Sequence, residues 1–336
     1  KSTDLWQKTT SFNGQMKKLS LMIALVAGSP AAADLLLGFP LECSLGQNCF
    51  IQNYVDRLPG EGVQDFACAA RSYNGHKGTD FSLNNMIDME RGVAVLAVAA
   101  GVVRGVRDGL PDILTTAPDA PDISGKECGN GVAIDHGNGW ETLSCHMKRG
   151  SVTVRQGDRI QAGQQIGQIG ASGNTQFPHL HLQVSKDGKI IDPFSSDKSE
   201  SCNIADPKTM WEEEIGYTAG GLISIGIDVV VPSFAEIKVG IKENPTRQRT
   251  ETPALVVWGY GHGVAADDQI SLSLTGPKGE VFSDTKVHPK NQAQFFYAVG
   301  RKKPTLGWPR GNYTGLVEMR RDGVLVDQKA ISFTLE

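Results

Sequence analysis

The sequence predicts a mainly β protein, in which a compact antiparallel β-sheet domain is followed by an immunoglobulin-like β-sandwich. Three observations support this fold class. Gly accounts for 39 of the 336 residues, more than helix ends would need, so turns are frequent. Short apolar or alternating runs recur between Gly-rich turns, which is typical of strands. Very few segments show the periodicity of a helix.

Composition limits the function classes. Hydrophobic residues make up 40% of the chain, which is enough for a core and excludes a disordered protein. The 33 basic and 37 acidic residues give a formal net charge of 33 − 37 = −4. Nucleic-acid-binding proteins use a basic face to displace counterions, so no nucleic-acid partner is expected.

The N-terminal region has the order of a secretory signal. Residues 16–33 contain two lysines, then a short apolar run, then small residues, and this order predicts a signal peptide with the mature chain starting near Asp34. Residues 1–15 are then upstream, non-native residues. The apolar run is too short to span a bilayer, so no membrane anchor is expected after signal removal. The alternative is a buried N-terminal helix. We expect a periplasmic or secreted protein.

Cysteine usage favours disulfides. The even count and the absence of C-x-x-C spacing argue against a structural zinc knuckle in an exported chain. Six cysteines allow 15 connectivities. Cys128 is predicted to pair with Cys145, because each lies at the edge of one of two strand runs joined by a Gly-rich turn at 136–139. The six are Cys43, Cys49, Cys68, Cys128, Cys145 and Cys202.

The first domain is expected over residues 34–217, with a disulfide-rich and loop-rich segment at its start. Residues 84–90 and 209–215 are the two short helix candidates, and 111–126 reads as a surface loop. The predicted strands are 79–83, 93–106, 131–136, 140–146, 165–169 and 179–184.

The second domain is expected over residues 222–336, after a Gly-rich hinge. Its regular strand spacing predicts an antiparallel sandwich. Its role is open: it could bind a wall polymer, bind a protein partner, or cover the site of the first domain. The predicted strands are 223–231, 235–241, 254–260, 269–274, 294–299, 312–319 and 324–335.

Two histidine motifs carry the candidate chemistry. His76 and Asp80 form H-x-x-x-D, and His179 and His181 form H-x-H. Residues two apart on a strand share a face. Catalytic zinc sites take three such protein ligands and leave a fourth position to water. His76, Asp80 and one of His179 and His181 are therefore predicted to hold one Zn²⁺. Three other histidines are expected outside the site: His136 at a strand end, and His262 and His288 in contact with solvent.

The flanks of these motifs resemble the lysostaphin/LytM-type zinc metallopeptidases, a family of peptidoglycan endopeptidases. The matching text includes N-G-H-K-G-T-D-F at 74–81, S-C-H-M at 144–147 and F-P-H-L-H-L-Q-V at 177–184. The resemblance runs from about Gly75 to Phe194. It implies that His76, Asp80 and His181 are the zinc ligands and that His146 and His179 are the catalytic histidines.

The function implied by the resemblance is a secreted zinc metalloendopeptidase acting on the peptide cross-links between peptidoglycan stems. Zinc lowers the pKa of a bound water towards about 7 and polarises the scissile carbonyl. The alternative is a catalytically inactive relative that binds or activates another cell-wall hydrolase. Such relatives typically lack metal ligands. The sequence leaves open which peptide bond is cut and whether His146 or His179 is the general base.

Overall fold

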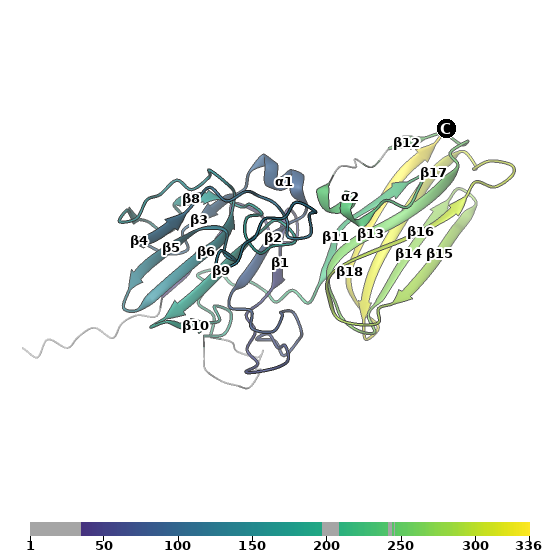
Figure 1. The fold of residues 1–336 in the computed structure, drawn as a ribbon. Coiled ribbons are helices and arrows are strands. Elements are labelled where there is room, and N and C mark those ends of the chain that lie inside the picture. Colours follow the sequence, from purple (N-terminus) through teal and green to yellow (C-terminus); the bar gives the residue numbers. More distant parts are fainter. Residues whose placement is uncertain (1–34, 197–207, 241–243, 245) are drawn as a thin grey trace, which may run out of the picture. The chain divides into compact units, whose positions relative to one another are not determined.

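The computed structural model describes residues 35–196, 208–240, 244 and 246–336 (Figure 1). The chain falls into two units, 1–33 and 34–336, and all described residues belong to the second. The predicted signal peptide (16–33) and the upstream residues 1–15 therefore lie outside the described residues, as does Cys202.

An antiparallel eight-stranded sheet forms the first part of the described chain (Figure 1). The strand order is β1-β2-β9-β6-β5-β4-β7, and β10 pairs with the C-terminal end of β9. The strands are β1 (Cys49–Asn53), β2 (Thr79–Leu83), β4 (Gly101–Arg107), β5 (Asn130–Gly137), β6 (Trp140–Met147), β7 (Arg159–Ile160), β9 (His179–Lys186) and β10 (Lys189–Ile191).

Two further short strands and one helix belong to the same part of the chain. Strands β3 (Ala94–Leu96) and β8 (Gln165–Gln168) form an antiparallel pair. Helix α1 (Met86–Arg91) begins after Asn85, whose side chain accepts a hydrogen bond from the backbone N–H of Asp88. This cap satisfies a backbone donor that the first helical turn leaves free. The short helix predicted at 84–90 is confirmed, and its observed bounds are 86–91.

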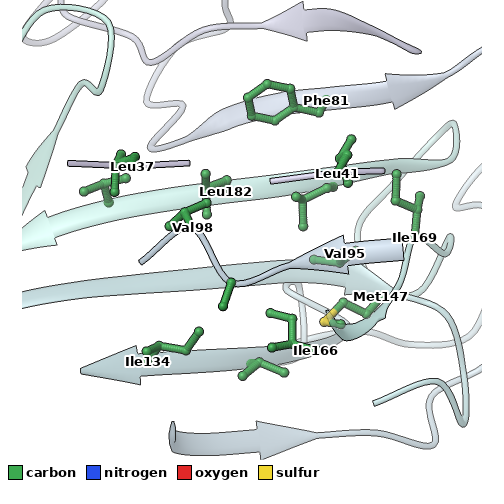
Figure 2. Packing of buried hydrophobic residues seen from close by; sticks show 14 of the residues in the cluster. Leu37, Leu41, Phe81, Val95, Val98, Ile134, Met147, Ile166, Ile169 and Leu182 are labelled. Carbon is green, nitrogen blue, oxygen red and sulfur yellow. The ribbon is translucent and has the colours of Figure 1, made fainter. Parts of the chain in front are cut away.

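The core lies on one face of the sheet and leaves the other face for polar side chains. Along β9 the apolar residues Leu180, Leu182 and Val184 are buried in the core cluster, and His179 and His181 alternate with them. Figure 2 shows Leu182 of β9 among the side chains of this cluster. Burial of each large apolar side chain contributes roughly 1.5–3 kcal/mol. This alternation fixes the strand's register, so both histidines are held on the face opposite the core.

The second part of the chain forms two more sheets with their own apolar cluster. The sheet orders are β11-β13-β16 and β12-β18-β17-β14-β15, and only β12 pairs in parallel. The cluster takes Leu255 and Val257 from β13, and Leu272 from β14. The strands are β11 (Gly221–Asp228), β12 (Arg247–Gln248), β13 (Ala254–Val264), β14 (Gln269–Gly276), β15 (Gly279–Val287), β16 (Gln292–Lys302), β17 (Gly311–Arg321) and β18 (Val324–Leu335).

The mainly β, antiparallel fold class is confirmed, and some local predictions are wrong. Residues 235–241 were expected as a strand, but helix α2 (Phe234–Val239) lies there, with Ser233 and Glu236 forming a capping box. The described residues 208–215 contain no helix. The loop-rich segment before residue 75 contains strand β1. The immunoglobulin-like assignment and the boundaries at 217 and 222 stay predictions.

Disulfides tie the first part of the chain. Cys128 and Cys145 are bonded, as predicted, and Cys43 is bonded to Cys49. Cys68 is also in a disulfide. Among the described residues, no helix has the length and apolar character needed to cross a membrane.

Candidate functional site

Three neighbouring strands position the predicted site residues. Asp80 lies on β2 directly opposite His181 on β9, and His181 lies opposite Cys145 on β6. His146 follows Cys145, and His76 lies in the loop that leads into β2. The order β2-β9-β6 therefore brings together residues that are more than 100 positions apart in the sequence.

The side chains of His76, Asp80 and His181 converge on one point. Their candidate ligand atoms all lie within 4.8 Å of one another. Asp80 Oδ1 is 3.1 Å from His76 Nε2 and 2.9 Å from His181 Nδ1, and these two nitrogens are 3.1 Å apart. Two imidazoles and a carboxylate are a donor set that catalytic zinc accepts. The three side chains fit a single divalent cation.

Charge around Asp80 favours the ionised carboxylate that a metal needs. Burial alone would raise the pKa of Asp80, but the charges of His76 and His179 and the hydrogen bonds from His181 and His76 hold it well below its usual value. Burial would likewise lower the pKa of His76, yet the charge of Asp80 and its hydrogen bond raise it. The carboxylate of Asp80 is therefore the negatively charged group that the surrounding histidines stabilise.

A hydrogen bond to the backbone orients the ring of His76. Its Nδ1–H donates to the backbone carbonyl of Tyr54 over 2.7 Å. When the ring is neutral, this bond selects the tautomer in which Nε2 has a lone pair to offer a metal. Nε2 is the atom that faces Asp80 and His181.

His146 and His179 stand beside the cluster with their Nδ1 atoms also held. His146 Nδ1 donates to the carbonyl of Ser172 over 2.8 Å. His179 Nδ1 donates to the carbonyl of Phe177 over 2.9 Å and is 3.0 Å from the hydroxyl of Thr175. The two rings are 4.5 Å apart between centroids.

Both imidazoles are neutral near pH 7. Burial lowers the pKa of His146 well below its usual value, and the charges of His179 and His181 lower it further. Burial also lowers the pKa of His179, against the opposing charge of Asp80. Because each Nδ1 carries the donated proton, each Nε2 is free to accept one.

The backbone at His146 is unusual. Its φ is +61°, in the left-handed region that residues with a side chain rarely adopt. Its N–H donates to the carbonyl of Cys128 over 2.8 Å, and its carbonyl accepts from the N–H of Gly170 over 3.0 Å. The adjacent bond between Cys128 and Cys145 anchors the same segment. Backbone outliers of this kind cost free energy and persist where surrounding contacts hold them.

A groove opens over the cluster. It is lined by His76, His146 and His181 and by the bonded Cys128 and Cys145. Its other lining side chains are mainly polar: Tyr73, Lys77, Glu127, Asn174 and Gln183.

All five predicted site residues come together, and several supporting residues were missed. Asn53 donates from its side chain to Asp80 Oδ2, and no sequence motif pointed to it. Thr175 lies four residues before His179, close enough in sequence for its contact to have been predicted. His136, His262 and His288 lie outside the cluster, as expected. The prediction that His262 and His288 contact solvent is wrong, because both are buried.

Comparison with known proteins gives a family match and several relatives. Residues 74–193 match the model of Peptidase family M23. The DD-carboxypeptidase/endopeptidase Mpg of Neisseria meningitidis is 39% identical over 67 residues, which are 20% of this chain and 15% of that protein. The peptidoglycan DD-endopeptidase ShyA of Vibrio cholerae is 30% identical over 121 residues, which are 36% of this chain and 23% of that protein. The chain thus spans less than a quarter of the length of either relative.

Solved structures that the chain matches include a mutant of the catalytic domain of the prophage-encoded M23 protein EnpA from Enterococcus faecalis. It is 20% identical with a TM-score of 0.31, over 45% of this chain and 92% of that chain. A zinc-containing peptidase from Vibrio cholerae is 23% identical with a TM-score of 0.29, over 45% of this chain and 41% of that chain. The family match spans all five site residues, and so, as its LytM-type motifs predict, the chain carries a domain of peptidase family M23 over residues 74–193.

Proposed function

We propose that this protein is an exported zinc metalloendopeptidase that hydrolyses peptide cross-links of bacterial peptidoglycan. The observation that carries the proposal is the convergence of His76, Asp80 and His181 on one point, with two further neutral imidazoles beside it. The substrate class is taken from the resemblance and from the names of the peptidoglycan endopeptidases to which the chain is similar.

His76 Nε2, Asp80 Oδ1 and His181 Nδ1 would hold the zinc ion. Zinc in such a site lowers the pKa of water towards about 7 and polarises a carbonyl group. The protein's own contribution is orientation: Tyr54 holds the ring of His76, and the β2-β9 register holds Asp80 opposite His181.

His146 and His179 would move the protons. Each ring keeps Nε2 unprotonated because its Nδ1–H is donated to a backbone carbonyl. A neutral imidazole at this position can take a proton from the attacking water and deliver it to the leaving amine. General acid–base catalysis of this kind contributes typically about 10²- to 10⁴-fold in rate.

The groove suits a polar peptide. Lys77, Glu127, Asn174 and Gln183 line it with both signs of charge and with amides. Peptidoglycan stems carry amide bonds, carboxylates and amines, so this lining offers partners for each of these groups.

The disulfides support an oxidising compartment. The Cys128–Cys145 and Cys43–Cys49 bonds are of a kind that persists in periplasmic and secreted proteins and is rare in reducing cytosol. We place the protein in the periplasm or outside the cell. For the second part of the chain, we propose a wall-polymer or protein partner.

The test is cleavage of purified sacculi and of defined cross-linked muropeptides by the full chain, with zinc content measured on the same sample. We expect one zinc per chain and release of cleaved stems identified by mass. His181→Ala should lose both zinc and cleavage, because it removes a ligand. His146→Ala should keep zinc and lose about 10²- to 10⁴-fold in rate. His136→Ala is the matched control, since His136 bonds Ala100 and Thr142 away from the cluster.

Two outcomes would contradict the proposal. Zinc retained by His181→Ala would overturn the ligand assignment. Stoichiometric zinc in the wild-type protein with no cleavage of any defined muropeptide would favour the inactive relative that binds or activates another hydrolase.

A further inference from the structure

The two oxygens of Asp80 have different partners. Oδ1 faces His76 Nε2 and His181 Nδ1. Oδ2 accepts a hydrogen bond from the side-chain amide of Asn53 over 2.9 Å. Both Asp80 and Asn53 are buried, with 2% and 6% of their surfaces exposed. The carboxylate is therefore divided into one oxygen directed at the metal cluster and one held by the protein.

A bulge in β1 makes this contact. The pairing of β1 with β2 runs regularly from Cys49 to Ile51, and then Asn53, not Gln52, lies opposite Asp80. A bulge inserts one residue and re-aims the side chains that follow it. Without it, Gln52 would occupy the position opposite Asp80.

The next residue supports a second member of the cluster. The carbonyl of Tyr54 accepts the Nδ1–H of His76 over 2.7 Å and also a hydrogen bond from the hydroxyl of Ser72. Tyr54 is itself fully buried. Two consecutive residues at the end of β1 thus hold two of the three side chains that converge on the site.

We propose that Asn53 is a positioning residue for the metal, which keeps Asp80 Oδ2 engaged so that Oδ1 alone is presented to the ion. This inference rests on the zinc site of the proposed function and adds the end of β1 to it. A neutral amide suits this role, because it donates a hydrogen bond without adding a negative charge or a cation that would compete with the metal.

Loss of this donor has two consequences. Oδ2 becomes a buried carboxylate oxygen without its partner, and the carboxylate is free to rotate about its terminal bond. The site then has to be ordered when the metal binds, so affinity falls. Removal of such outer partners typically costs about 10- to 100-fold in metal affinity.

The test is the zinc dissociation constant of the full chain, measured by competition with a chelator, for Asn53→Leu and the smaller Asn53→Ala. We expect an increase of about 10- to 100-fold for both variants. Unfolding of each metal-free protein is followed in parallel, so that a loss of fold is seen separately from a loss of affinity.

Asn130→Leu is the matched control. Asn130 is another buried asparagine in the same sheet, and its side-chain amide donates to the carbonyls of Leu110 and Met147, not to a residue of the cluster. We expect it to lower stability while leaving the zinc dissociation constant of the folded protein unchanged.

A spectroscopic measurement separates positioning from general destabilisation. Co²⁺ in place of zinc gives a visible spectrum that depends on the number of ligand atoms. If Asp80 can offer both oxygens, the spectrum of Asn53→Leu should differ from wild type, and that of Asn130→Leu should not.

Folded Asn53 variants that bind zinc with wild-type affinity would overturn the inference and leave the proposed function standing. A wild-type chain that binds no zinc would overturn the proposed function itself.

Discussion

Two buried aspartates, one in each part of the described chain, are neutralised in different ways. Asp80 in the first sheet is surrounded by imidazoles, with His76 and His181 within 3.1 Å of its Oδ1. Asp268, next to β14, is fully buried and is held by Arg321, whose Nε and Nη2 donate to its two oxygens over 2.8 and 2.7 Å.

We interpret this difference as that between a structural ion pair and the proposed metal site. Arginine keeps its charge at any accessible pH and forms a two-pronged bond with the carboxylate of Asp268. Imidazole, unlike guanidinium, can give up its proton and then offers a lone pair beside the carboxylate of Asp80. The carboxylate of Asp80 in the first sheet therefore lies where a metal cation could bind to it. In the second part of the chain, the carboxylate of Asp268 is bound by Arg321 and stabilises the fold.

The largest stability effect is expected from breaking the pair of Asp268 and Arg321. Asp268→Ala should lower the free energy of unfolding by about 3 kcal/mol, because Arg321 would keep a largely buried charge without its partner. Denaturant unfolding of the metal-free chain measures this loss. The zinc dissociation constant should stay within about twofold of wild type, since distant sites act independently.

The exposed pair of Arg247 and Glu336 is the control for this prediction. It belongs to the same part of the chain, and its side chains are 75% and 56% exposed. Arg247→Ala should cost less than about 1 kcal/mol. A loss as large as that of Asp268→Ala, or a shift in zinc affinity with Asp268→Ala, would contradict the division of roles.

A smaller effect, confined to the first sheet, is expected from Gly78→Ala. A Cβ at position 78 would lie 2.7 Å from the ring of His181 and from the carbonyl of Leu182. Either the ring of His181 or the backbone at one of these positions must shift, so zinc affinity should fall by about tenfold or more. Chelator competition measures the change.

Gly105→Ala provides the comparison, because a Cβ there would meet no atom within 4 Å. It lies on β4 in the same sheet. Equal zinc affinities for the two variants would show that the space around His181 does not control the site.

The cluster could be predicted because its signals are local. H-x-x-x-D and H-x-H are short patterns, and alternation on β9 places His179 and His181 on one face. Their family flanks then indicated which histidine joins His76 and Asp80. The meeting of Asp80 with His181 depends on strand pairing, which the buried apolar residues of β9 support.

The residues of β1 that hold the cluster in place could not be predicted in the same way. All five residues of β1 are buried, so the strand shows no alternation, and a bulge decides that Asn53 faces Asp80. Strand β15 was missed because its side chains are mostly exposed. Helix α2 had a readable signal in the Ser233–Glu236 capping box, but its apolar residues also alternate as in a strand.

A third buried aspartate, Asp192, sharpens the comparison because, among the described residues, no imidazole or arginine is hydrogen-bonded to its carboxylate. Its Oδ1 accepts a hydrogen bond from the N–H of Phe194 over 3.0 Å, while its buried Oδ2 has no hydrogen-bond partner in the described chain. Burial raises the pKa of Asp192 to about 7, against the opposing effects of that hydrogen bond and of Arg57.

The sign of the resulting pH dependence follows from linkage. Between about pH 4 and pH 7 the folded chain keeps the proton on Asp192 and the unfolded chain releases it. The contribution of Asp192 is therefore fully present below about pH 4 and is lost as the pH rises towards 7. Asp192→Asn keeps the acceptor for Phe194 but cannot ionise. Relative to wild type, its advantage should grow by about 2–3 kcal/mol between pH 5 and pH 8, as measured by denaturant unfolding at each pH. A difference between the two proteins that stays constant over this range would show that Asp192 is ionised in the fold.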